Sequence, residues 1–183
     1  YSFHAGFCVD LQPQHLGSQK VSSLELWNYN ECLETFANSF KLISDYARTV
    51  GINIAIENNV LTANHLSTYG SDCLLLTDYD SYLELSHSIG FNPPLLMDVA
   101  HLNVTTSSLS LKRDDQLRLF LEHVDSFHLS ENDGYVDSNK PIQSDSWFLK
   151  YVSEKNVDCT LEVYTDEMPV LQKQLKLAQE VLR

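Results

Sequence analysis

The stretch INIAIE, residues 52–57, is a short apolar run that ends in an ionisable residue, Glu57. The same pattern recurs as LLMD at 95–98, VDSFH at 124–128 and CTLE at 159–162. These runs end in Asp98, His128 and Glu162, so the four ionisable residues are 41, 30 and 34 positions apart. Apolar runs of this kind are typical of strands covered on both faces, and each separation is close to the length of one strand–helix unit.

Stretches with helical periodicity follow the apolar runs. Residues 31–50 repeat apolar side chains at helical spacing and stop at Gly51. Residues 79–89 follow an Asp78 cap and stop at Gly90. The other predicted elements are a first strand within residues 1–7 and helices at 114–123, 146–155 and 166–183. Five strand–helix units in sequence predict an α/β fold with a parallel sheet, and the family resemblance given below implies the (β/α)8 TIM-barrel type.

The chain is strongly acidic, with 12 Lys and Arg against 25 Asp and Glu and a formal net charge of −13. Nucleic acids and anionic membranes attract Lys and Arg, so neither is an expected partner. No apolar run approaches the roughly eighteen residues that span a bilayer, and no export signal is visible, so we expect a cytoplasmic protein. No glycine-rich phosphate-binding motif is present, and we expect no nucleotide cofactor.

The length of the chain bears on the completeness of the barrel. A (β/α)8 barrel takes about 250 residues, whereas this chain has 183 and shows about five units. We therefore expect residues 1–183 to form a single domain, and the resemblance given below implies that it is the C-terminal portion of a barrel that is incomplete on its N-terminal side. Open strand edges would favour a homo-oligomer if these residues stand alone.

The strand ends carry the expected chemistry. In a parallel barrel the carboxyl ends of the strands meet at one mouth, so the four ionisable residues should face one another. They are Glu57, Asp98, His128 and Glu162. Bare carboxylates would repel one another, and a divalent cation removes that penalty. The pattern predicts one bound metal ion, with Mn²⁺, Mg²⁺ or Co²⁺ favoured by three oxygen ligands and one nitrogen, and Zn²⁺ also compatible.

Each of these residues has a structural alternative when it is taken alone. A carboxylate at a strand end often caps the following helix, which suits Asp98 or Glu57. His128 could equally be a core histidine with satisfied hydrogen bonds. Four such endings in consecutive units favour a shared site over independent capping.

Local motifs surround the four residues. They are HAG at 4–6, IEN at 56–58, DVAH at 98–101, HLSENDG at 128–134 and LE at 161–162. In this combination the chain resembles the xylose isomerase-like superfamily of sugar isomerases and epimerases, whose barrel also serves the apurinic endonuclease branch. The resemblance extends from Phe3 to Val163, and the DxxH, HLxxND and strand-ending Glu motifs are specific mainly in combination.

The resemblance implies roles for individual residues. It places a single divalent metal ion at the four strand-end residues, and it gives Glu57 and Glu162 the paired acid/base roles of the epimerases. It places His101 against the substrate. His4 matches a histidine that binds an additional metal in the nuclease branch and lines the pocket elsewhere, and a strand-end histidine bonded to backbone is an equal alternative.

The loop after His128 departs from both branches. It carries Asp137, Ser138 and Asn139 where the nuclease branch has an Asp-x-His pair for a further metal, and an amide replaces imidazole poorly. It also lacks the Arg that some ketose epimerases place there. Asn132 and Asp133 are candidates to contact the sugar, with a simple polar loop as the alternative.

The expected reaction is the isomerisation or epimerisation of a keto sugar. This reaction removes a proton next to a carbonyl, and a metal ion bound to the oxygens stabilises the enediolate that forms. Glu57 and Glu162 would take and return the proton. Three alternatives remain: a dehydratase acting on an inosose-like cyclitol at the same site, a nuclease-like phosphoesterase, and a sugar-binding barrel without catalysis.

Overall fold

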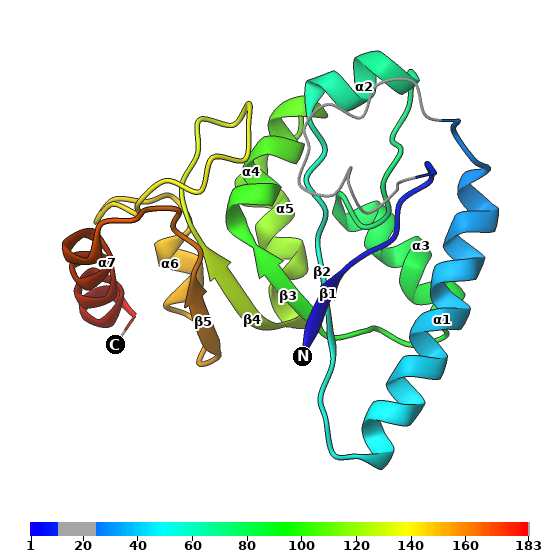
Figure 1. Cartoon of the computed structure of the whole chain (residues 1–183), viewed down its shortest axis with the longest axis horizontal. Helices are drawn as coiled ribbons and strands as arrows, with labels where there is room; N and C mark the ends of the chain where they lie inside the picture. The colour runs from blue at the N-terminus through cyan, green and yellow to red at the C-terminus, as the bar shows by residue number, and fades with distance from the viewer. Residues whose placement is uncertain (11–24, 183) are drawn as a thin grey trace.

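The structure is a computed structural model that describes residues 1–10 and 25–182. Its strands form one parallel sheet in sequence order (Figure 1). They are β1 (Ser2–His4), β2 (Ala55–Glu57), β3 (Leu95–Asp98), β4 (Val124–Leu129) and β5 (Asp158–Leu161). Each strand pairs with the next one along the chain, whereas a doubly wound sheet reverses its strand order. Consecutive parallel pairing is the arrangement of a barrel wall, so the predicted α/β fold class is confirmed over these five units.

Helices connect the strands and pack on one another around the sheet. They are α1 (Tyr29–Thr49), α2 (Ala63–Tyr69), α3 (Tyr79–Ile89), α4 (Val99–Ser108), α5 (Arg113–Phe120), α6 (Leu149–Val152) and α7 (Met168–Val181), with a 3₁₀ turn η2 (Leu121–His123). In Figure 1, α1 and α3 lie to the right of the sheet and α6 and α7 to its left. Within the described residues, no helix combines the length and the apolar character needed to cross a membrane.

Local end signals explain the helices that the sequence predicts. The side chain of Asp78 accepts a hydrogen bond from the backbone N–H of Ser81 at 2.9 Å, and α3 ends at Gly90 with φ +90°. The bounds of α3 are therefore those predicted. The sequence analysis did not predict α2 or α4, and α6 is shorter than the predicted helix at 146–155.

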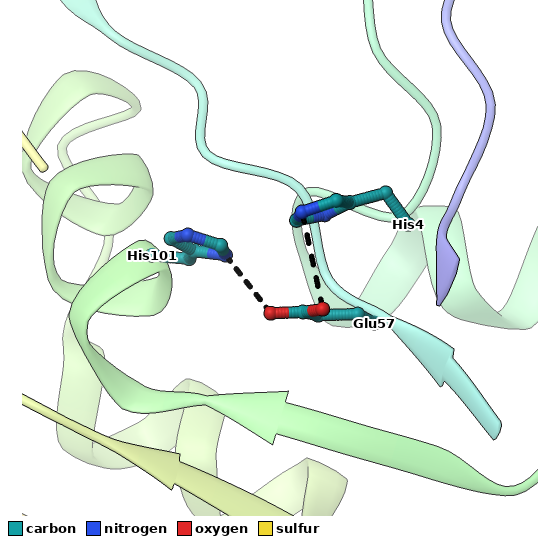
Figure 2. Close-up of side chains that lie close together, drawn as sticks. All are labelled: His4, Glu57 and His101. Atoms are coloured by element: carbon teal, nitrogen blue, oxygen red, sulfur yellow. Dashed lines mark ion pairs between the residues drawn. The ribbon is translucent and has the colours of Figure 1, made fainter. Parts of the chain in front are cut away.

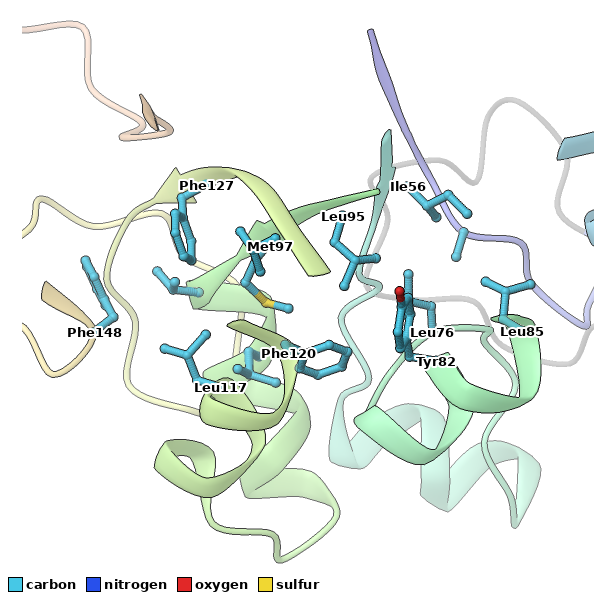
Figure 3. Close-up of a cluster of buried hydrophobic side chains, with 14 of the residues drawn as sticks. Ile56, Leu76, Tyr82, Leu85, Leu95, Met97, Leu117, Phe120, Phe127 and Phe148 are labelled. Carbon is cyan, nitrogen blue, oxygen red and sulfur yellow. The ribbon is translucent and has the colours of Figure 1, made fainter. Parts of the chain in front are cut away.

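The core lies between the sheet and the helices (Figure 3). Its fully buried members include Ile56, Leu95, Met97 and Phe127 from the strands and Tyr82, Leu85, Leu117 and Phe120 from α3 and α5. All four residues of β3 are buried, as predicted for a strand covered on both faces, whereas most of the edge strand β5 is exposed. This packing fixes the central strands, and with them the ionisable residues at their ends.

Candidate metal centre

The structure brings the four strand-end residues together. Glu57, Asp98 and His128 lie on β2, β3 and β4, and Asp98 pairs with His128 across the sheet. Glu162 follows β5, and its backbone N–H continues the ladder to Leu129 O at 3.0 Å. One potential ligand atom from each of the four residues lies within 4.8 Å of the others. We call these four residues the strand-end ring.

The Nδ1 atom of His128 faces the three carboxylates. It lies 2.8 Å from Glu162 Oε2, 3.1 Å from Glu57 Oε1 and 3.8 Å from Asp98 Oδ2. The close contacts with the carboxylates of Glu162 and Glu57 raise the pKa of His128 to about 10, and the contact with His128 lowers the pKa of Glu162. The carboxylates of the ring therefore favour a positive charge between them. A proton on His128 or a bound cation would each supply that charge.

The carboxylate of Asp98 has two different oxygens. Oδ1 accepts hydrogen bonds from the backbone N–H groups of Ala100 and His101, both at 2.8 Å, and so caps α4. Oδ2 is buried and has no hydrogen-bond partner. Burial raises the pKa of Asp98 to about 6. The capping and ligand interpretations of Asp98 are thus compatible, because each uses a different oxygen.

A divalent cation fits this donor set. The Oε2 atom of Glu162 is also buried and forms no hydrogen bond, although it lies 2.8 Å from Nδ1 of His128. Two buried carboxylate oxygens without donors are costly to desolvate, and cations of the Mn²⁺ or Mg²⁺ type are bound by such oxygens together with imidazole.

Asn58 fixes the backbone that carries Asp98. Its side chain accepts a hydrogen bond from the Asp98 N–H at 2.7 Å and donates one to the Asp98 carbonyl at 3.0 Å. The residue directly after Glu57 therefore bridges β2 to the end of β3. Asn59 extends this bracing, because its amide donates to the carbonyls of Ala5, Gly6 and Leu75.

A second group consists of His4, Glu57 and His101 (Figure 2). His4 Nε2 and His101 Nδ1 each lie 3.9 Å from an oxygen of Glu57. However, His101 Nδ1 lies 2.9 Å from the carbonyl oxygen of Asn58. A carbonyl oxygen only accepts, so Nδ1 carries a hydrogen and has no lone pair for a metal ion. His101 could therefore offer a metal ion only its Nε2, and both histidines border the strand-end ring.

Asn132 and Asp133 lie in neither of the two groups. The Asn132 side chain donates to the Ala100 carbonyl and accepts from the Asn103 amide, both at 2.8 Å. Asp133 is exposed and accepts from the backbone N–H of Tyr135 at 3.0 Å. Both side chains hold the loop in shape here, and their contact with a sugar stays a prediction.

The sequence analysis missed the position of Asp137. Its Oδ2 lies 3.2 Å from Nε2 of His101. Asn139 instead has a left-handed backbone, with φ +43°, and its side-chain oxygen accepts from the hydroxyl of Ser130 at 3.3 Å. The path of a loop without apolar periodicity is not readable from sequence, so the only available signal was the acidic residue itself.

Comparisons with known proteins show the fold. No protein-family model and no curated protein sequence matches the chain. A D-tagatose 3-epimerase-like protein superposes with a TM-score of 0.69 at 17% identity over 99% of this chain and 61% of that chain. A xylose isomerase domain protein from Alicyclobacillus acidocaldarius gives 0.61 at 10% identity over 99% and 63%. The IolI protein with a bound zinc atom gives 0.57 at 16% identity over 86% and 59%.

The parallel sheet in sequence order and these superpositions show that the chain has the fold of TIM-barrel structures. This chain spans about three fifths of the length of the structures that it matches. The predicted fold relationship is confirmed at this level, and substrate and reaction are the subject of the proposal that follows.

Proposed function

We propose that this chain carries the metal-binding and acid/base residues of a divalent-metal-dependent sugar isomerase or epimerase. The observation that carries the proposal is the strand-end ring, in which two buried carboxylate oxygens form no hydrogen bond. Its residues Glu57, Asp98, His128 and Glu162 would hold the metal ion. The likeness to an epimerase-like barrel and to a zinc-containing barrel supports a sugar substrate and a divalent ion.

Glu57 and Glu162 are the proposed acid/base pair. Each places one oxygen near His128 Nδ1, at 3.1 and 2.8 Å, so the two carboxylates approach the same point from different strands. The lowered pKa of Glu162 keeps this carboxylate ionised, which is the form that accepts a proton. A bound divalent cation would supply polarisation of the substrate carbonyl and its neighbouring hydroxyl.

The proton transfer determines the reaction. One carboxylate removes a proton from the carbon next to the carbonyl, and the other returns a proton. Return to the opposite face of the same carbon inverts that centre, whereas return to the neighbouring carbon moves the carbonyl. His101 is held by the Asn58 carbonyl at 2.9 Å, so a substrate hydroxyl beside the ring would share its Nε2 with Asp137 Oδ2.

Exchange of the substrate α-proton with D₂O tests the proposal. With Mn²⁺ and a panel of D-fructose, D-tagatose and D-psicose, the protein should exchange the α-proton of at least one sugar. Glu162→Gln should lower the exchange rate by about 10²–10⁴-fold, the usual contribution of a positioned acid or base. Glu154→Gln, at an exposed position, is the matched control. A wild-type protein that binds no divalent ion, or an exchange rate unchanged in Glu162→Gln, would refute the proposal.

A further inference from the structure

The side chain of Asn58 takes the place of a strand residue where the pairing between β2 and β3 stops. The ladder ends with Glu57 opposite Leu96, whereas β3 continues for two further residues to Asp98. The Asp98 N–H donates to Oδ1 of Asn58 at 2.7 Å, and Nδ2 of Asn58 donates to the Asp98 carbonyl at 3.0 Å. One side-chain amide therefore supplies both the acceptor and the donor that a neighbouring strand would supply.

The Asn58 amide is buried, and its hydrogen bonds to Asp98 use both of its ends. Asn58 is 1% exposed and Asp98 is 0% exposed. A buried amide is costly unless its oxygen and its nitrogen both find partners, and here both partners belong to the backbone of a single residue. The side chain of Asn58 is therefore placed to hold Asp98 and is shielded from any substrate.

The oxygen of Asp98 that faces the strand-end ring depends on the position of this backbone. Oδ1 is held by the backbone N–H groups of Ala100 and His101. Oδ2 forms no hydrogen bond and lies 3.8 Å from Nδ1 of His128. Small divalent ions hold their ligands in narrow ranges, about 2.0–2.1 Å for the oxygens around Mg²⁺. A shift of the Asp98 backbone would therefore move Oδ2 away from the other three ligands.

The backbone of Asn58 adds a contact on the opposite side of the same turn. Its carbonyl accepts a hydrogen bond from Nδ1 of His101 at 2.9 Å. The backbone N–H of His101 in turn donates to Oδ1 of Asp98 at 2.8 Å. Asn58, Asp98 and His101 thus form a closed circuit of hydrogen bonds directly beside Glu57. The side-chain amide of Asn58 is the part of this circuit that a substitution removes.

We infer that Asn58 is a positioning residue for the metal centre, which acts through Asp98 to set the affinity of the site for a divalent ion. The inference rests on the proposed function, since it concerns the ion of the same site. It assigns the Asn58 side chain no contact with the ion or with the substrate. Removing a partner of a ligand residue typically lowers metal affinity by about 10–100-fold, and an effect of this size is expected here.

Calorimetric titration with Mn²⁺ tests the inference on two neighbouring asparagines. Asn58→Ala should raise the Kd for Mn²⁺ by about 10–100-fold at unchanged stoichiometry. Asn59→Ala is the matched control, because Asn59 is also buried and its amide also donates to backbone carbonyls, none of which belongs to a residue of the ring. Both variants should unfold at lower urea concentrations, but Asn59→Ala should keep the wild-type Kd for Mn²⁺.

The exchange of the substrate α-proton gives a second measurement. Asn58→Ala leaves the acid/base residues Glu57 and Glu162 in place, so exchange that is lost at low Mn²⁺ should return when the ion is raised above the Kd of the variant. Each asparagine is also replaced by serine, which retains a polar group at the position. All titrations are repeated in sucrose, which favours the folded state, and folding is monitored by circular dichroism.

Several outcomes would overturn the inference. They are an unchanged Mn²⁺ Kd in the folded Asn58 variants, an equal rise in the Asn59 variants, exchange that stays lost at saturating Mn²⁺, and failure of both Asn58 variants to fold in sucrose, which would assign Asn58 to the fold alone. A wild type that binds Mn²⁺ and responds to Asn58→Ala, but exchanges no α-proton, refutes only the proposed function. A wild type that binds no Mn²⁺ refutes both.

Discussion

Met97 and Asp98 are consecutive residues of β3, and both are 0% exposed. Met97 packs in the apolar core with Phe127 and Leu95. Asp98 is buried at the carboxyl end of β3. One of its oxygens caps α4, and the other forms no hydrogen bond. Equal burial thus has opposite consequences one residue apart. The core stabilises the fold, whereas the strand-end ring leaves polar groups unsatisfied, and we interpret this as the cost of a site prepared for a cation.

The largest expected effect belongs to the core side of this comparison. Phe127→Ala removes a fully buried ring from the middle of β4 and leaves a cavity. The free energy of unfolding should fall by about 3–5 kcal/mol, as for other large-to-small core substitutions. Urea unfolding followed by circular dichroism measures this change.

Phe91→Ala is the matched control, because the same side chain is 44% exposed there. Its expected loss is about 1 kcal/mol or less. If the two variants lose the same stability, the apolar core described here does not dominate the fold.

The ring side of the comparison predicts a metal-dependent effect. Mn²⁺ at about 100 times its Kd should stabilise the wild-type protein by about 2.7 kcal/mol, because the ion binds only the folded state. Asp98→Asn should abolish this stabilisation. Asparagine is as good a helix cap as aspartate, so α4 should keep its start, and only the ligand oxygen is lost. Thermal unfolding with and without Mn²⁺ measures both quantities.

The metal-free protein gives the complementary result. Without Mn²⁺, Asp98→Asn should be no less stable than the wild type, because it removes one of the mutually repelling carboxylates while retaining the cap. A variant that remains stabilised by Mn²⁺ would show that Asp98 is not a ligand. A variant that unfolds readily without the ion would show that the ring is a structural feature.

The fold was predictable where the sequence pattern is local. Helix α3 has the predicted bounds and β4 begins at the predicted residue, Val124, because a capped helix and an apolar run are each determined by neighbouring residues. Helix α4 was not predicted because its sequence, VAHLNVTTSS, is buried nearly all round and has little amphipathic periodicity. Helix α2 was missed because it is only seven residues long and buries no side chain completely.

The site was predictable to the extent that strand ends determine it. The separations of Glu57, Asp98, His128 and Glu162 were sufficient to bring the four together, because each residue lies within one position of the end of a strand. The position of Asp137 depends on the path of a loop and on its contact with His101, 36 positions earlier. No periodicity encodes such a contact, so three-dimensional structure was needed to find it.

The smallest expected change in stability concerns Asp114, a carboxylate whose hydrogen-bond donors are present in the structure. Asp114 therefore serves as a comparison for Asp98, which has an oxygen without a hydrogen bond. Asp114, in the first turn of α5, accepts hydrogen bonds from Lys150 Nζ at 2.8 Å and the Tyr151 hydroxyl at 2.6 Å. The Lys150 and Tyr151 hydrogen bonds lower the pKa of Asp114 below 3.8. Because the folded-state pKa is the lower one, the stabilisation is present above about pH 4 and is lost as the pH falls through the folded-state pKa.

Asp114→Asn should therefore cost less than about 1 kcal/mol at neutral pH, since the side chain is 39% exposed and solvent screens the ion pair. The difference from the wild type should shrink in urea unfolding as the pH falls through the lowered folded-state pKa of Asp114. Asp115→Asn, in the same first turn, is the control, because it shares the helix-dipole contribution but is exposed. A loss in Asp114→Asn that persists at low pH would mean that packing of Tyr151, rather than charge, accounts for it. Asp98→Asn, by contrast, should show its difference only when a metal ion is present.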